Sequence, residues 1–210
     1  MLFGRDWQVE LGPLTTAAGV VRLRPIRARD GRQWSRLRLL NRAELEPWEP
    51  SDEVSWQRRH TASQWTPLCA SLRAQARSGQ IVPMVIEVDG AYAGQITIGN
   101  ITRGQLRSAW VGYWVDRQVT GRGVATAAVA LAVDHCFGAL QLHRVDATVR
   151  PENAGSLAVL RHSGFREEGL LRRYLHVDGA WRDHLLVAIT AEEVADSMVA
   201  RVVRSGRARF

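Results

Sequence analysis

The most informative absence from this chain is that of lysine. All 28 of its lysine-plus-arginine positions are arginine, against 21 acidic residues, which gives a formal net charge of +7. A Walker P-loop needs a lysine after its glycines, so this class of nucleotide site is excluded. The charge favours anions such as cofactor phosphates, acidic peptides or RNA, and does not bear on the fold. A GC-rich genome would also favour arginine, so the charge alone indicates no function.

Cysteines and long apolar runs are scarce as well. Cys69 and Cys136 lie far apart, and neither they nor the six histidines show metal-ligand spacing, so we expect buried reduced thiols and no metal site. No apolar run approaches the roughly 20 residues that cross a bilayer. Residues 1–6 show no signal-peptide pattern, so we expect a cytoplasmic protein. The length of 210 residues suits one domain with a sizeable core.

The periodicity of apolar residues predicts an α+β chain. Strands are predicted over residues 20–26, 82–88, 91–101, 109–115, 144–149, 165–177 and 180–189. Helices are predicted over 30–45, 51–72, 124–135 and 153–163, and from Glu192 and Glu193 onward until a loose basic tail. Asp-Gly pairs at 89–90 and 178–179 favour type I′ hairpin turns between strands.

A glycine-punctuated loop follows the strand that ends at Val115. It leads into a helix that is apolar nearly all round and therefore packs on a sheet, so the strand at 144–149 should lie parallel to the one before the loop. Glycines let the backbone approach an anion, and the helix start offers free N–H groups. We predict a diphosphate cradle here. Its predicted contacts are Gln118, Gly121, Arg122, Gly123, Val124, Ala125 and Thr126.

This loop also has simpler interpretations. Its Gln-x-x-Gly-x-Gly spacing differs from the Gly-x-Gly-x-x-Gly of a dinucleotide-binding fold. Gly121 and Gly123 would also suit a tight strand-to-helix turn without any ligand. Arg122 would be unremarkable as an exposed arginine, and Thr126 would suit a helix cap.

Four segments in order and spacing resemble the GCN5-related N-acetyltransferases (GNAT). They are Ala109–Val115, Gln118–Thr126, Arg150–Ser156 and His162–Phe165. Asn41-Arg42, Pro47-Trp48 and Glu168-Gly169 resemble the RimJ and RimL type, which acetylate ribosomal-protein alanine termini. The resemblance covers roughly residues 19–190.

This resemblance implies the GNAT fold and a division of the chain. The fold has a mixed, mostly antiparallel sheet that is splayed between its fourth and fifth strands and flanked by helices, with a C-terminal helical tail. We expect an N-terminal arm over residues 1–18, the acetyltransferase domain over 19–190, and a C-terminal helix with a basic tail over 191–210.

The resemblance also implies a site for acetyl-CoA as co-substrate. The pantetheine arm would lie in the splay and pair with the backbone at Trp114 and Val115, and the Val115 N–H would polarise the thioester carbonyl. Asn153 would contact the pantetheine, and Ser156 would protonate the leaving thiolate, with Tyr174 as the competing donor. Trp114 would equally suit an ordinary core, and Asn153 and Ser156 would equally suit helix caps.

The general base is open at this stage. A protein α-amine has a pKa of about 7.7 to 8.0, so a weak base suffices, whereas lysine at about 10.4 demands more. The resemblance places the first two helices over the acceptor, so Glu46 is predicted as the base. Glu44, Glu49 and Glu168 are alternatives, and each of the four would also suit an ordinary surface charge. Leu175 and His176 stand where some RimL-like relatives carry a glutamate as the candidate base. The base of those relatives therefore has no counterpart at these positions of this chain.

The predicted function is acetyl transfer from acetyl-CoA to a protein N-terminal α-amine, that of a ribosomal protein, by a monomer or homodimer. A first alternative is acetylation of a small amine, a polyamine or aminoglycoside, in a pocket made acidic by the carboxylates of residues 44–53. A second is a non-catalytic acyl-CoA sensor or an RNA-associated protein. No direct nucleic-acid role is expected, although the arginines of residues 201–209 suit contact with RNA.

Overall fold

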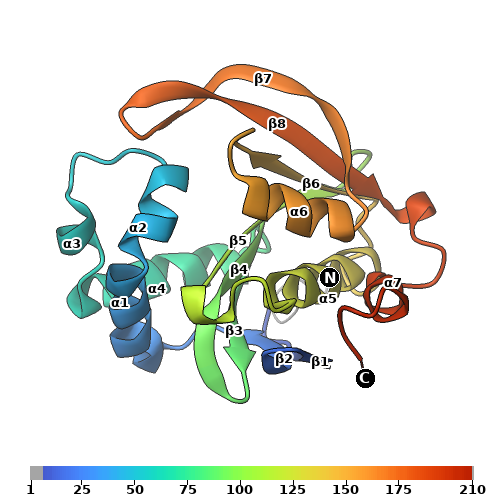
Figure 1. Cartoon of the computed structure of the whole chain (residues 1–210), viewed down its shortest axis with the longest axis horizontal. Helices are drawn as coiled ribbons and strands as arrows, with labels where there is room; N and C mark the ends of the chain where they lie inside the picture. Colours follow the sequence, from blue (N-terminus) through green and yellow to red (C-terminus); the bar gives the residue numbers. More distant parts are fainter. Residues whose placement is uncertain (1–6, 210) are drawn as a thin grey trace.

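One eight-stranded sheet organises the molecule (Figure 1). The computed structural model describes residues 7–209. The strands run in the order β1-β2-β3-β4-β5-β6-β8-β7, and only the β5–β6 pair is parallel. Their bounds are β1 Leu11–Thr16, β2 Gly19–Pro25, β3 Val82–Val88, β4 Ala91–Thr102, β5 Ser108–Val115, β6 Arg144–Val149, β7 Arg166–Val177 and β8 Ala180–Thr190. The predicted mixed, mostly antiparallel α+β architecture is confirmed.

Helices cover both faces of this sheet (Figure 1). The α-helices are α1 Gly31–Leu40, α2 Arg42–Leu45, α3 Trp56–Arg59, α4 Ala62–Arg77, α5 Val124–Phe137, α6 Ala154–His162 and α7 Met198–Arg204. Short 3-10 turns are η1 Ala28–Asp30, η2 Glu46–Trp48, η3 Arg117–Val119 and η4 Ala191–Glu193. The apolar α5 is buried in the main core, as its composition predicts, while α1 and α4 enclose a second core around Trp34 and Trp65. No helix within residues 7–209 is long and apolar enough to span a membrane.

The sheet opens between β5 and β6. Only Ser108, Ala109 and Trp110 pair with β6, opposite Arg144, Val145 and Asp146. β5 then runs on to Val115 without a partner from β6, while β6 stays paired with β8 as far as Val149. The predicted splay is therefore present, with a closed end at the first residues of both strands.

The Asp-Gly hairpins form as predicted. Asp89 and Gly90 have φ angles of 50° and 78°, and Asp178 and Gly179 have 50° and 71°, the positive values that a type I′ turn requires. The β7–β8 hairpin reaches across the molecule to the segment after η2 (Figure 1). There the Ser51 N–H donates to the His176 carbonyl at 2.9 Å. The hairpin tip and this segment together arch over the open end of the splay.

The two termini meet on the first strand. β1 lies inside the expected N-terminal arm and pairs with β2, which leaves its other edge open. Thr15 and Arg209 exchange backbone hydrogen bonds of 2.8 and 2.9 Å along that edge, and Ala208 is buried in the main core. The prediction of a loose tail is therefore wrong for Ala208 and Arg209. Residues 1–6 and 210, which the expected arm and tail also include, lie outside the described part.

Helix boundaries differ from the predicted ones in three places. The first predicted helix breaks at Asn41, and the second becomes α3 and α4 on either side of His60 and Thr61. The C-terminal helix starts at Met198 and not at Glu192, because the Glu193 carboxylate accepts the Thr190 N–H at 2.8 Å and closes a single 3-10 turn. The residues where the three helices break or start are polar and make hydrogen bonds that compete with helix continuation.

Candidate active site

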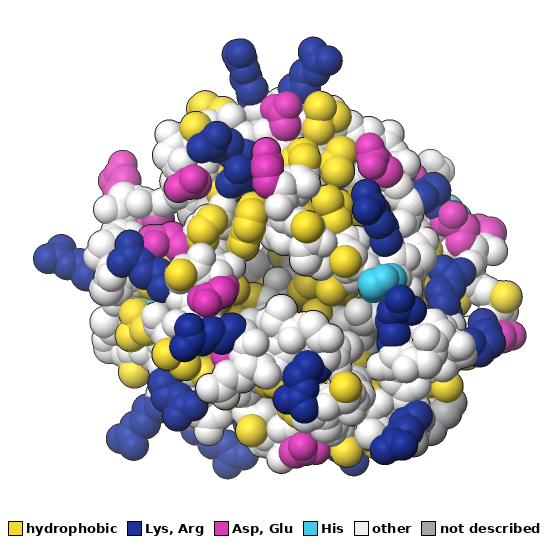
Figure 2. All heavy atoms as spheres, in the orientation of Figure 1, with side chains coloured by type: hydrophobic (Ala, Val, Ile, Leu, Met, Phe, Trp, Pro, Cys, Tyr) yellow, Lys and Arg dark blue, Asp and Glu magenta, His cyan; other side chains and the backbone are white. Residues whose placement is uncertain are grey.

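A cleft of about 200 Å³ occupies the open end of the splay. Figure 2 shows the hollow on this face, beneath the β7–β8 hairpin and between α2 and α6. The cleft is lined by β5, β6, β8, α6 and the η2 turn. The lining residues are Trp48, Val111, Gly112, Tyr113, Ala147, Thr148, Val149, Arg150, Asn153, Ser156, Leu160 and His184.

The free edge of β5 presents the Val115 N–H to this gap. The Asp116 N–H donates to the Ala93 carbonyl of β4 at 2.7 Å. Successive N–H groups of a strand point to opposite sides, so the N–H groups of Val115 and Tyr113 face away from β4, toward the splay. By the same alternation the backbone of Trp114 faces β4.

The glycine loop has the backbone that an anion cradle needs. Gly121 and Gly123 have φ angles of 75° and 85°, and Gly123 is the N-cap of α5. No side chain within the described residues caps this helix, so the N–H groups of its first turn, from Val124 to Thr126, are left for an anion. These groups fit a diphosphate.

The side chains around the loop already have contacts. The Arg122 guanidinium donates to the Ala17 carbonyl of the β1–β2 turn at 2.6 Å, and the Asp116 carboxylate accepts the backbone N–H of Gln118 at 3.3 Å. The Thr126 side chain is buried, and Ala125 is half-buried. Arg122 is therefore positioned beside the loop by β1, an element that the sequence analysis did not anticipate.

Ser156 lies at the cleft beside a tyrosine that the sequence analysis did not single out. The Asn153 side chain accepts the Ser156 N–H at 3.0 Å and thereby caps α6. The Tyr113 hydroxyl lies 3.0 Å from the Ser156 hydroxyl. Burial raises the pKa of Tyr113, so the phenol stays protonated and is suited to donate. The single phenol proton has two acceptors in reach, the Ser156 hydroxyl and the Ser156 carbonyl at 3.3 Å, and when it goes to the hydroxyl Ser156 keeps its own proton for an acceptor in the cleft.

Two predicted site residues have side chains outside the cleft. Tyr174 is 48% exposed and contacts the cleft only through His184, whose ring it meets edge-on at 5.5 Å. Trp114 packs in the second core, with the Arg38 guanidinium 5.1 Å from its ring and Tyr92 at 6.2 Å.

The four carboxylates predicted as candidate bases all pair with arginine, and none lines the cleft. Glu46 pairs with Arg42 at 2.5 Å, Glu44 with Arg117 at 3.6 Å, Glu49 with Arg38, and Glu168 with Arg144 and Arg166, both at 2.6 Å. Hydrogen bonding to Arg144, together with the charges of both arginines, lowers the pKa of Glu168.

The acceptor side of the cleft is built by residues from distant segments. The Arg150 guanidinium lies 5.3 Å from the Trp48 ring and donates to the Pro47 carbonyl at 3.0 Å. The buried Asn41 side chain accepts the Arg117 N–H at 2.8 Å, which ties the helix break to the β5–α5 loop. These contacts give the Asn41 and Pro47-Trp48 motifs a physical role as anchors of the cleft wall.

Residues 21–166 match the family model described as an acetyltransferase (GNAT) domain. The chain belongs to the GNAT acetyltransferase family. The GNAT fold and the N-acetyltransferase class predicted from the sequence are thereby confirmed. Within residues 7–209 no cluster of three or more His, Cys, Asp or Glu side chains is arranged to hold a metal ion.

Similar proteins include ribosomal-protein N-acetyltransferases of the RimJ type. A structure of Mycobacterium smegmatis RimJ in complex with CoA-disulfide is 60% identical, with a TM-score of 0.97, and each chain covers 98% of the other. The Escherichia coli [ribosomal protein uS5]-alanine N-acetyltransferase is 29% identical over 91% of this chain and 97% of its own. The probable N-acetyltransferase YjcK of Bacillus subtilis is 42% identical over 101 residues, which is 48% of this chain and 56% of YjcK. The predicted resemblance to RimJ is confirmed.

Proposed function

We propose that this protein transfers the acetyl group of acetyl-CoA to the N-terminal α-amine of a ribosomal protein in the cytoplasm. The observation that carries the proposal is the cleft through the β5–β6 splay, in a chain that is 60% identical to a RimJ in complex with CoA-disulfide. A gap open at this point gives a thioester and an amine access to the same backbone N–H from two sides.

The cofactor would run from the glycine loop into the gap. Its diphosphate would take the N–H groups at the start of α5, with Arg122 and Gln118 beside it. The pantetheine would lie along the free edge of β5, near Asn153. Its backbone partners would be Tyr113 and Val115, since these N–H groups face the splay.

The chemistry needs a stabilised oxyanion and a proton for the leaving thiolate. The Val115 N–H would receive the oxyanion. Ser156 would deliver the proton, held in place by its α6 backbone and by the Tyr113 hydroxyl at 3.0 Å. Tyr174 is the weaker candidate because it is 48% exposed and does not line the cleft.

The charges at the cleft favour an α-amine over a polyamine. Among residues 7–209 no carboxylate lines the cleft, and the charged side chain in its lining, Arg150, pairs with Glu152 outside the lining at 3.2 Å. A polycationic acceptor would find no carboxylate in the lining. Glu44, Glu46, Glu49 and Asp52 of the 44–53 segment each pair with an arginine and lie outside it. An α-amine brings a single charge and loses it readily near neutral pH.

Intact-mass detection of acetyl transfer tests the proposal. Peptides that begin with Ala, Ser, Met or Pro are incubated with acetyl-CoA, together with a lysine peptide whose N-terminus is blocked and with spermidine. Acetylation confined to Ala or Ser termini is expected. Acetylation of spermidine or of the lysine peptide alone would replace the proposed acceptor, and binding of acetyl-CoA without any transfer would favour a sensor.

A further inference from the structure

His184 is a buried histidine on β8 whose ring faces the cleft. It is 3% exposed and lines the same cleft as Ser156 and Tyr113. On the acceptor side its neighbours in the lining are Trp48 and Arg150. Sequence analysis gave it no role, because the strand around it shows no motif.

The hydrogen bonds of the ring define which nitrogen carries the proton. Nδ1 lies 3.1 Å from the Arg182 carbonyl. A carbonyl only accepts, so Nδ1 must donate, and in the neutral ring Nε2 then holds a free lone pair. Among residues 7–209 no hydrogen-bond partner of Nε2 is found. The Tyr174 ring packs edge-on against the imidazole at 5.5 Å and restricts its rotation.

We propose that His184 is the general base that accepts the proton of the acceptor amine, an inference that rests on the proposed function. Three observations combine: the Nε2 lone pair is available, the ring lies at the cleft, and no carboxylate shares that lining. Tyr174 on β7 contacts the ring, and the other titratable groups of the cleft lining are Tyr113 on β5 and Arg150 after β6. A protonated tyrosine and an arginine are not bases, so the imidazole is the proton acceptor of the cleft.

Acetyl transfer begins when the amine nitrogen attacks the thioester carbon. The C–N bond forms, and the carbonyl π electrons move to the oxygen at the Val115 N–H. The nitrogen gives one proton to Nε2 of His184. The oxyanion then re-forms the carbonyl, the C–S bond breaks, and the thiolate takes one proton through the Ser156 hydroxyl. His184 gives its proton to water, and Ser156 regains a proton from water.

The substitution His184→Asn separates this role from a structural one. The Asn amide is positioned to keep the hydrogen bond to the Arg182 carbonyl, while nothing remains at the position of Nε2. His184→Gln is the second variant, used if the first fails to fold by circular dichroism. His143→Asn is the matched histidine control, since His143 lies at the other end of β6 and contacts Glu192 at 2.9 Å.

The readout is kcat/KM for the amine acceptor across pH, with acetyl-CoA affinity by calorimetry. For His184→Asn we expect a loss of about 100-fold near pH 6.5, the scale of a general base. The loss should shrink below about 10-fold near pH 9.5, where an α-amine with a pKa of about 8 is already neutral. Acetyl-CoA affinity should stay within about twofold, and His143→Asn should match the wild type at both pH values.

The other outcomes overturn the proposal. A loss equal at all pH values, or a loss of acetyl-CoA affinity, would make His184 structural. An unchanged rate near pH 6.5 would remove it from the reaction, and the same pH signature in Glu46→Gln would assign the base to Glu46. A wild type that acetylates only spermidine contradicts the proposed function alone, and His184 is then tested in the same way on spermidine. A wild type that acetylates no amine contradicts both.

Discussion

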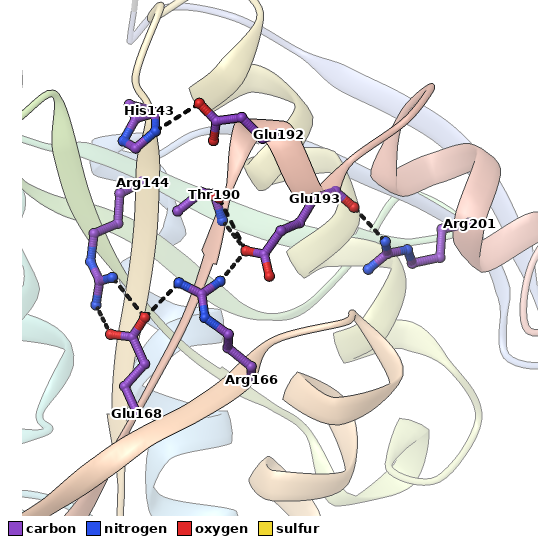
Figure 3. Close-up of polar contacts among 8 residues, drawn as sticks. All are labelled: His143, Arg144, Arg166, Glu168, Thr190, Glu192, Glu193 and Arg201. Atoms are coloured by element: carbon purple, nitrogen blue, oxygen red, sulfur yellow. Dashed lines mark hydrogen bonds and ion pairs between the residues drawn. The ribbon is translucent and has the colours of Figure 1, made fainter.

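The two ends of strand β6 use the same residue types in opposite ways. At the closed end, which comprises residues 143–146 and their partners, Arg144 pairs with Asp146. Arg144 also pairs with Glu168, and Arg166 joins Glu168 to Glu193 (Figure 3). At the open end, which is the cleft beyond Asp146, Arg150 and His184 have no carboxylate in the lining. The closed end links its charges in one network, whereas at the open end Arg150 pairs with Glu152, outside the lining, and Nε2 of His184 is left for a substrate.

This difference explains how the splay is maintained. Ion pairs at the closed end connect β6, β7 and η4 where β5 still pairs with β6 (Figure 3). Beyond that point β5 and β6 separate, and their free edges are held apart by α6 and by the hairpin arch. A network of charges therefore fixes the point from which the gap opens, and the chemistry occurs where that network is absent.

Acid should weaken the helices around His60 before it weakens the closed end. His60 is 5% exposed, accepts a hydrogen bond from Arg38 at 3.0 Å, and has a pKa lowered from 6.5 to about 4 by burial and by Arg38. The unfolded chain therefore takes up this proton first, so stability is full above pH 6.5 and falls as the pH drops toward 4. The loss is at most about 3 kcal/mol.

Urea denaturation at pH 7, 5.5 and 4 measures this loss, with hydrogen exchange to locate it. Exchange should rise first in α1, α3 and α4. The Glu168 pairs lose their contribution in the same direction but at lower pH: the lowered pKa keeps that contribution until the pH falls below the ordinary value of about 4.3. His60→Gln should flatten the profile between pH 6.5 and 4, and an unchanged slope would contradict the account.

Removing the proton donor of the open end should reduce turnover. For Ser156→Ala we expect kcat to fall about 100-fold with acetyl-CoA affinity nearly unchanged, because the hydroxyl acts in the transition state. Steady-state kinetics and calorimetry check this expectation. A comparable fall in Tyr174→Phe, with Ser156→Ala close to wild type, would transfer the donor role to Tyr174.

A side chain in the glycine loop should weaken cofactor binding. Gly123 has a φ of 85°, and an added Cβ would lie 3.0 Å from the Arg207 carbonyl. In Gly123→Val the free loop relaxes from the left-handed conformation, and re-forming that conformation to bind the diphosphate costs about 2 kcal/mol, which predicts an acetyl-CoA affinity lower by about 30-fold. Gly179→Val, at a φ of 71° in the distant hairpin, controls for strain alone. Equal losses in both variants would contradict an anion cradle at Gly123.

Loosening the closed end should have the smallest effect. Glu168→Gln removes a charge held by two arginines and should lower stability by about 1 kcal/mol, since the group is partly exposed. The urea midpoint at pH 7 measures this change, and Glu192→Gln, which loses its ion pair with His143, should shift it less. A fall in kcat without any loss of stability would instead make Glu168 a base.

Local patterns in the sequence predict much of this fold. The Asp-Gly turns, the glycine loop and the apolar α5 each carry their signal within a few residues, so their conformations follow from local chemistry. β1 lacks such a signal because Gly12 and Pro13 interrupt its alternation. The sequence predicts the start of α7 at Glu192, because two adjacent acidic residues are typical of the first turn of a helix. In the structure the Glu193 carboxylate instead accepts the Thr190 N–H and closes a separate 3-10 turn.

The residues of the cleft also differ in whether a local sequence pattern predicts them. Asn153 and Ser156 belong to a contiguous segment, so sequence reasoning found them. Tyr113 reaches Ser156 from 43 positions away, and His184 reaches the cleft through the pairing of β6 with β8. Neither has a local signature, because only the sheet brings them to the gap.

The central claim is that cofactor and acceptor meet in the β5–β6 splay. The most direct measurement is a crystal structure with a conjugate of CoA and an alanine-initiated peptide joined at the acetyl carbon. The account predicts that the conjugate passes through the gap, with its carbonyl oxygen at the Val115 N–H, its sulfur at Ser156 and its peptide nitrogen at Nε2 of His184. A peptide bound outside the gap, or a pantetheine arm away from the edge of β5, would contradict it.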